Sequence, residues 1–138
     1  MFPAVVINYW AVLVAAIAAT AIGMLWYGPL FGRQWMSMAG MTQKGMKNMK
    51  LKPAQSMTIG FVTTLLMAYV LAHFVAYAKP ASWIEGLQTG LWIWLGFLAT
   101  TMLGMVLWEG KPFKLYVLNT AYYLVSLAVM GAILAAWP

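Results

Sequence analysis

The chain has 138 residues, of which 64% are hydrophobic and 7% charged, and its formal net charge is +6. Soluble proteins carry about 25% charged residues, and a domain this small could not bury so much apolar surface in its own core. The composition therefore excludes an ordinary soluble protein, and the absence of cysteine excludes disulfides, thiolate chemistry and cysteine-bound metals.

Four long stretches with almost no charged side chains follow one another along the chain. We predict that they form transmembrane helices at about residues 5–27, 54–78, 84–108 and 115–137. Each exceeds the ~20 residues that cross a bilayer, and only helices or closed barrels satisfy every backbone group in lipid. Gly28 and Pro29 should end the first helix. The expected fold is all-α: a single integral membrane domain over residues 1–138, built as a four-helix bundle.

The connector between the first two helices holds five of the eight basic residues. A basic cluster beside apolar stretches is typical of contact with anionic lipid rather than with nucleic acid. We predict a short amphipathic segment lying on the membrane surface. The residues expected to reach the headgroups are Lys44, Lys47, Lys50 and Lys52. A disordered basic loop, which Gly40 and Gly45 favour, is the alternative.

The distribution of lysine and arginine sets the expected orientation. The first and third connectors hold seven of the eight basic residues, and the second holds only Lys79. Because positively charged loops stay in the cytoplasm, both termini should lie outside the cytoplasmic membrane (N-out/C-out). No basic residue precedes the first apolar stretch, so we expect a retained helix rather than a cleaved signal peptide.

Small residues recur every fourth position on the predicted third helix. Gly86 and Gly90 form one face, and Gly96, Thr100 and Gly104 form another. Helices in lipid associate through close backbone contact, which small side chains allow. The two faces would permit one contact within the chain and one between chains. Packing within a single bundle is the simpler interpretation.

Polar side chains gather at two depths of the predicted bundle. The candidate functional positions of the outer group are Asn8, His73, Glu85 and Gln88. Those of the inner group are Arg33, Glu109, Asn119 and Tyr122. Between the two groups the middle of the bundle offers little except the hydroxyls of Thr20, Thr63, Thr64 and Ser126.

Two of these positions each have two interpretations. Among histidine, lysine, arginine and carboxylate side chains, His73 is the only one inside the four apolar stretches, the third of which begins at Gly86, and this favours a functional role. It also lies ~27 Å along its helix, close enough to the outer interface to bond a neighbouring helix or reach water. Asn119 could line a polar crevice open to the cytoplasm, or supply one interhelical hydrogen bond.

The residues of a conventional active site are missing from this sequence. Glu85 and Glu109 are the only carboxylates, and they bracket the third helix ~36 Å apart, which excludes a catalytic pair within one chain. The absence of aspartate excludes a Ser–His–Asp triad. Methionine thioethers suit Cu(I), but the one histidine is predicted on the other side of the membrane from the methionine-rich connector. We expect no catalytic residue, no cofactor and no metal.

Several short motifs resemble those of a known family. They are Asn8-Tyr9, the turn WYGPLFGRQW from Trp26 to Trp35, Gly96-Phe97, WEGKP from Trp108 to Pro112, and the stretch from Asn119 to Leu134. Together they resemble a family of small bacterial membrane proteins known only as a domain of unknown function. The resemblance covers almost the whole chain and implies four helices in a bacterial cytoplasmic membrane. It implies no activity.

Three functions follow from these patterns. The leading hypothesis is a non-catalytic bundle that forms homo-oligomers or serves as an accessory subunit of a larger membrane assembly, because small faces are in surplus and mid-membrane polar groups are scarce. The alternative is a small oligomeric transporter or channel with a pathway near His73 and Asn119. The weakest is a lipid-modifying enzyme that uses Glu109, Arg33 and Tyr27.

Overall fold

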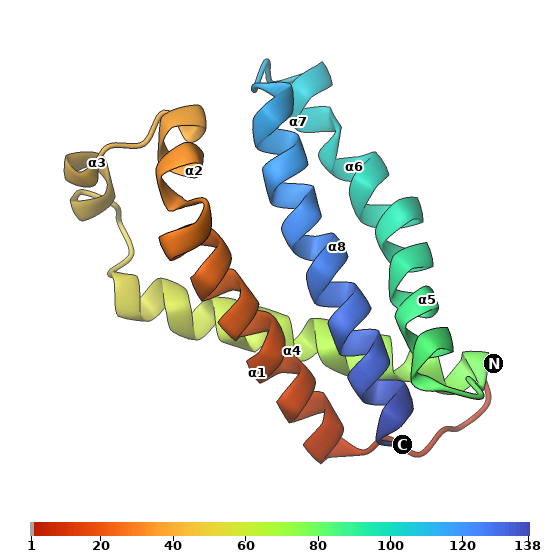
Figure 1. Ribbon diagram of the computed structural model, residues 1–138. Coiled ribbons are helices and arrows are strands. Elements are labelled where there is room, and N and C mark those ends of the chain that lie inside the picture. The colour runs from red at the N-terminus through yellow and green to blue at the C-terminus, as the bar shows by residue number, and fades with distance from the viewer. Residues whose placement is uncertain (1) are drawn as a thin grey trace.

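The computed structural model describes residues 2–138, and the regular structure of this part of the chain is entirely helical. Four helical spans are long and apolar enough to cross a membrane: Tyr9–Leu30, Pro53–Ala78, Trp83–Leu107 and Phe113–Ala136. The chain is therefore a multi-pass membrane protein with an all-α fold, as its sequence predicts. Both termini lie at the same end of the bundle (Figure 1), as four passes require.

The first span begins with α1 (Tyr9–Leu25). Asn8 sets its start, since the side-chain oxygen accepts hydrogen bonds from the N–H groups of Trp10 at 3.1 Å and Ala11 at 3.3 Å. The first N–H groups of a helix have no partner in the helix itself, and asparagine is one of the best residues to provide one. The helix therefore begins at Tyr9, later than the expected position 5.

Gly28 and Pro29 interrupt the first span with a kink between two helices, at the position where the first helix was expected to end. Gly28 has non-helical backbone angles (φ −109°, ψ −105°) inside the segment η1 (Trp26–Leu30), yet helical turns continue on both sides of it. The Phe31 N–H still donates to Trp26 O at 2.9 Å, across the bend. Proline removes a donor and crowds the preceding turn, which is a common cause of kinks.

The first connector contains two short helices, α2 (Gly32–Ala39) and α3 (Gln43–Lys47). Gly40 ends α2 in a left-handed conformation (φ 69°), which glycine adopts without steric cost. The Thr42 hydroxyl caps α3 by accepting from the Gly45 N–H at 3.0 Å. The basic segment thus has helical structure of its own.

The closest contact in the bundle joins α5 (Trp83–Ile93) to α8 (Phe113–Ala136). A Cβ atom at Gly86 would overlap the backbone of Gly131, and one at Gly90 would overlap the carbonyl of Leu127. The face formed by Gly86 and Gly90 therefore packs within the chain, where the absence of side chains lets the two backbones touch.

Beyond α5 the third span is irregular. It continues as the π-helical segment η2 (Trp94–Ala99), α6 (Thr100–Met102) and α7 (Gly104–Leu107). A π-type turn places an extra residue in each turn, which shifts the helix faces before and after it. The uniform helix expected over residues 84–108 is thus replaced by an α-helix whose second half begins with a widened turn.

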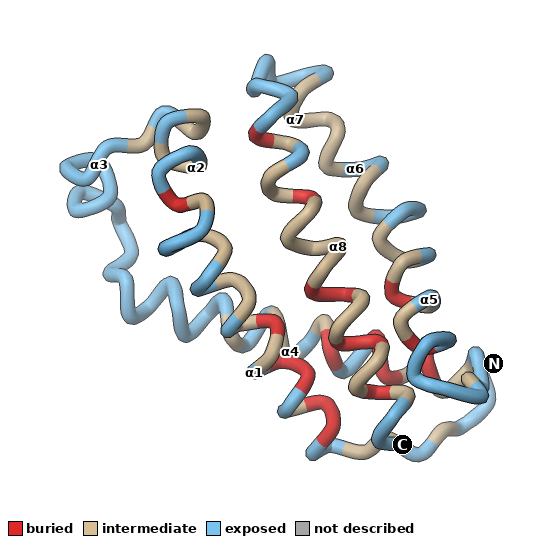
Figure 2. Tube along the Cα trace, in the orientation of Figure 1, coloured by how far each residue is buried: buried red, intermediate tan, exposed pale blue. Residues whose placement is uncertain are grey.

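The second span, α4 (Pro53–Ala78), packs against the bundle with only its second half. Its buried residues are Ala68, Leu71, Ala72 and Val75, whereas every residue from Leu51 to Gly60 is exposed. Figure 1 shows α4 running across the other helices, and Figure 2 shows the buried residues gathered where α1, α4 and α8 meet. Toward the first connector, α4 therefore diverges from α1.

The glycine contact between α5 and α8 generates a stability prediction. Gly90→Ala should lower the free energy of unfolding by about 1–3 kcal/mol, because the added methyl group must push α8 away. Unfolding by SDS in mixed micelles measures this change. Gly60→Ala is the matched control, since nothing lies within 4 Å of a Cβ there. Wild-type stability of Gly90→Ala would contradict the contact.

Candidate functional site

Two tyrosine side chains form hydrogen bonds that join α8 to the first span. The Tyr27 hydroxyl donates to Asn119 Oδ1 at 2.8 Å. The Tyr122 hydroxyl reaches across to donate to Ala19 O at 3.0 Å. The candidate residues Asn119 and Tyr122 thus both take part in hydrogen bonds between helices, and the rings of Tyr27 and Tyr122 meet edge-on with centroids 5.5 Å apart.

A groove opens between α1, α4 and α8, because α4 diverges from α1 on this side of the bundle. Its volume is about 460 Å³, within the range of small-molecule sites. The residues that line it are methionine, small and aromatic side chains together with six hydroxyl residues: Thr20, Thr63, Thr64, Tyr122, Tyr123 and Ser126. No lining residue is charged, so the groove offers hydrogen bonds without a formal charge.

The threonine hydroxyls of the groove are bonded to their own helices. Thr20 donates to Ala16 O at 2.8 Å, and Thr63 and Thr64 each donate to Gly60 O at 2.8 Å. Such bonds satisfy a hydroxyl proton within a helix and leave the oxygen free to accept.

Ser126 differs from the threonines. It is 1% exposed, and its Oγ has no hydrogen-bond partner among the described residues. The Tyr122 hydroxyl, one turn earlier on α8, donates to Ala19 O rather than to Ser126. A buried hydroxyl without a partner is rare in folded proteins.

Two further cavities lie toward the end of the bundle that carries the first connector, and each shares one lining residue with the cavity before it. Tyr123 also lines a cavity of about 380 Å³ that includes Asn119 and Met102. Met102 in turn lines one of about 370 Å³ that includes Glu109. Arg33, by contrast, is exposed on α2. Asn119 and Glu109 therefore line neighbouring cavities rather than a shared one.

The outer candidates do not form one site. Asn8 caps α1 and also donates from Nδ2 to Pro138 O at 3.3 Å. Glu85, in the first turn of α5, accepts from the Ala81 N–H at 2.5 Å, where the helix dipole favours a carboxylate. Gln88 is exposed. Asn8 and Glu85 thus have the contacts of residues that start a helix.

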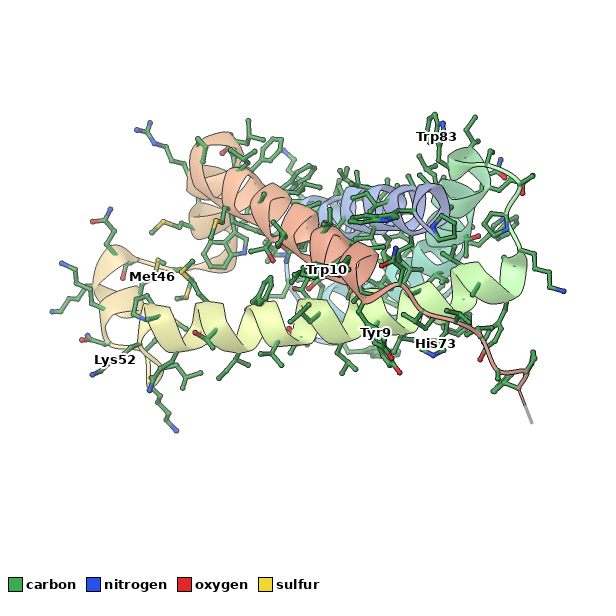
Figure 3. All side chains as sticks on the ribbon, turned by 90° about the horizontal axis from the view of Figure 1, so that it is seen from below. Tyr9, Trp10, Met46, Lys52, His73 and Trp83 are labelled. Carbon is green, nitrogen blue, oxygen red and sulfur yellow. The ribbon has the colours of Figure 1, made fainter. Side chains whose placement is uncertain are left out.

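His73 lies on the outer half of α4, between Tyr69 and Tyr77. Its ring centroid is 4.7 Å from that of Tyr69 and 6.3 Å from that of Tyr77, and Nδ1 is 2.9 Å from Tyr69 O. Figure 3 shows it beside Tyr9, whose ring stacks on Tyr69. His73 lines neither the groove nor the cavity that includes Asn119.

Sequence reasoning missed the groove, although it had noted the mid-membrane hydroxyls. Thr20, Thr63 and Ser126 come from three different helices, and their convergence depends on the angle at which α4 crosses α1. Helical periodicity within one segment does not encode that angle. The similar depth of the hydroxyls in their spans was the one signal available.

The groove is lined by uncharged side chains. Among residues 2–138, no three His, Asp or Glu side chains lie together as a metal site would require. The groove itself holds hydroxyl and thioether groups, which are weak acids and bases.

The sequence profile of one family matches residues 10–135, nearly the whole chain. The chain belongs to the DUF1761 family. The description of DUF1761 is only that of a protein of unknown function, so membership confirms the resemblance seen in the motifs and brings no activity with it. No curated protein and no solved structure matches the chain.

The hydrogen bond between Tyr27 and Asn119 predicts a measurable coupling free energy between these two residues in this DUF1761 protein. In a double-mutant cycle of Tyr27→Phe and Asn119→Leu, the coupling free energy should be about 0.6 kcal/mol, the average for such bonds in membranes. Unfolding by SDS in mixed micelles measures it. Tyr9→Phe paired with Asn119→Leu is the control and should be additive. Additivity in both cycles would mean that the Tyr27–Asn119 bond adds no stability.

Proposed function

We propose that this protein is a non-catalytic membrane subunit that assembles with further copies of itself. The observation that carries the proposal is the low burial of the third span. Only 11% of its most apolar window is buried within the chain, against 22–33% in the other three spans. A span with so small a buried share has the largest free surface for another helix.

The exposed face of this span, which points away from the rest of the bundle, has the shape that helix association in lipid requires. Nothing lies within 4 Å of a Cβ built at Gly96, in contrast to the filled sites at Gly86 and Gly90. Trp92, one turn earlier, is 73% exposed, and Thr100 is exposed one turn later. A large side chain beside an open glycine allows two copies to interdigitate, with Trp92 of one over Gly96 of the other.

A bacterial cytoplasmic membrane, with both termini outside, is the location and orientation that we propose. The first connector, with α2 and α3, and the connector after α7 together hold seven of the eight basic residues. This distribution favours the cytoplasmic side for both connectors. The exposed lysines of the first connector then lie at the headgroups. Lys44, Lys47, Lys50 and Lys52 are all exposed, which supports contact with anionic lipid.

A small oligomeric transporter or channel is the second candidate. The cavities that share Tyr123 and Met102 favour it, because they lead from the middle of the bundle toward Glu109. Toward the outer end, however, the core around Ala15, Ala68 and Leu127 is at most 1% exposed, which disfavours a pathway through a single copy. Solute flux into reconstituted vesicles distinguishes this candidate from a non-conducting subunit.

The orientation has a direct test, because the chain contains no native cysteine. Single-cysteine variants at exposed positions, Asn48→Cys in the first connector and Ser82→Cys in the second, are treated with a membrane-impermeant maleimide in intact spheroplasts. Ser82→Cys should be labelled, and Asn48→Cys should be labelled only after lysis. The reverse pattern would place the termini in the cytoplasm and refute the proposed orientation.

Self-assembly is tested by mass in mild detergent. The wild-type chain should form a homo-oligomer, and Gly96→Leu should weaken it at least about tenfold, because the side chain fills the site of close approach. Gly60→Leu is the matched control, an equally open glycine on α4 outside the proposed contact. A wild-type chain that is strictly monomeric across concentrations, or equal effects of both variants, would refute the proposal.

A further inference from the structure

We propose that the groove between α1, α4 and α8 binds an uncharged amphiphile with a hydroxyl or phenol head and an apolar tail. This site lies within a single copy of the chain and on other helices than the proposed contact between copies. It therefore does not depend on self-assembly.

The first reason is that Ser126 is left without a partner. Ser126 is one of the residues that line the groove and is 1% exposed, and its Oγ has no donor or acceptor from the described residues in hydrogen-bond geometry. In the interior of a membrane protein, an unpaired hydroxyl costs free energy that water cannot readily relieve. A polar group that enters the groove supplies the missing hydrogen bond.

The second reason is the balance of donors and acceptors around Ser126. The hydroxyl groups of Thr20, Thr63 and Thr64 already donate their protons to backbone carbonyls. The threonine hydroxyl oxygens can therefore only accept a further hydrogen bond. Ser126 can still donate as well as accept. A ligand that both donates and accepts is therefore matched, and a hydroxyl group is the simplest that does so. A ketone or an ether would leave the threonine oxygens without a donor.

The third reason is the absence of charge. No residue that lines the groove is charged, so a phosphate, carboxylate or ammonium head would be held in lipid without a counter-charge. The lysines of the first connector are exposed and are not part of the lining. Charged headgroups are therefore favoured at the membrane surface, and an uncharged head is favoured inside the groove.

The apolar part of the ligand follows from the remaining lining. Met24, Met57, Met67 and Met130 surround the hydroxyls, and methionine adapts its shape to varied apolar partners. The groove is open rather than enclosed, and the neighbouring first half of α4 is exposed. A tail can therefore leave between α1 and α4 directly into the bilayer.

Three kinds of membrane molecule share this chemistry: diacylglycerols, isoprenoid alcohols and alkylated hydroquinones. Their probes are 1,2-dioctanoylglycerol, farnesol and decylhydroquinone, each compared with its O-methylated analogue, which cannot donate. The full chain in nanodiscs is titrated with each probe, and binding is counted by native mass spectrometry. At least one probe should bind saturably, and its methylated analogue should bind about tenfold more weakly. The probe that binds identifies which of the three classes of membrane molecule the groove takes.

Two variants place the binding in the groove. Ser126→Ala should weaken binding about fivefold, and it should fold at least as well as the wild type because it removes an unpaired buried hydroxyl. Gly60→Leu, whose Cβ meets no atom within 4 Å, should fill the groove and abolish binding. Ser56→Leu, exposed on α4 outside the lining, is its control, and Gly96→Leu should leave binding unchanged.

Several results would overturn the proposal. One is that none of the three probes binds. Another is that the methylated analogues bind as well as the alcohols, or that Ser126→Ala and Gly60→Leu both bind like the wild type. Displacement of the bound probe by phosphatidylglycerol, competing for the same site, would show that the groove takes a charged head instead.

Discussion

Helices inside a bilayer gain little from hiding apolar surface from one another, because lipid tails are as apolar as leucine. What holds this bundle together is therefore close packing and a limited number of hydrogen bonds. The contact of Gly86 and Gly90 with the backbone of α8 provides the packing, and α8 becomes the helix to which the others attach. Tyr122 fixes α1 to it, and Trp94 Nε1 donates to Thr120 O at 2.8 Å, which fixes the widened turn of the third span. Only α4 lacks a comparable attachment over its first half, and the groove exists for that reason.

The sequence predicts those features that depend on composition along one segment. Charge-free stretches mark all four spans, and the fourfold spacing of Gly86 and Gly90 marks the face that packs inside the chain. Features that depend on competition between segments were not predictable in the same way. Gly28 and Pro29 were expected to end the first helix, and a kink does interrupt it there, but the sequence did not predict that the next helix, α2, follows the kink directly. The π-helical turn at Trp94–Ala99 has no residue pattern that announces it.

The candidate residues illustrate the same limit. Asn119 had two interpretations, a crevice residue or a hydrogen-bonding residue, and the structure supports both: it accepts from Tyr27 and lines a cavity. His73 was a candidate because it is an isolated ionisable group. In the structure its neighbours are the aromatic rings of Tyr69 and Tyr77 on its own helix, with Tyr9 close by. Ser126 was noted only as one of four hydroxyls in the middle of the bundle, because one serine in an apolar helix is ordinary. Its lack of a partner becomes visible only when three helices are placed together.

The arrangement of α2 and α3 has a mechanical consequence. The bend at Gly28 joins α1 directly to α2, and α3 joins α2 to the free first half of α4, so one short folded connector bridges the two walls of the groove. The distance between α1 and the first half of α4 is therefore also the distance that this connector has to span, and the lysines of the connector lie on that link.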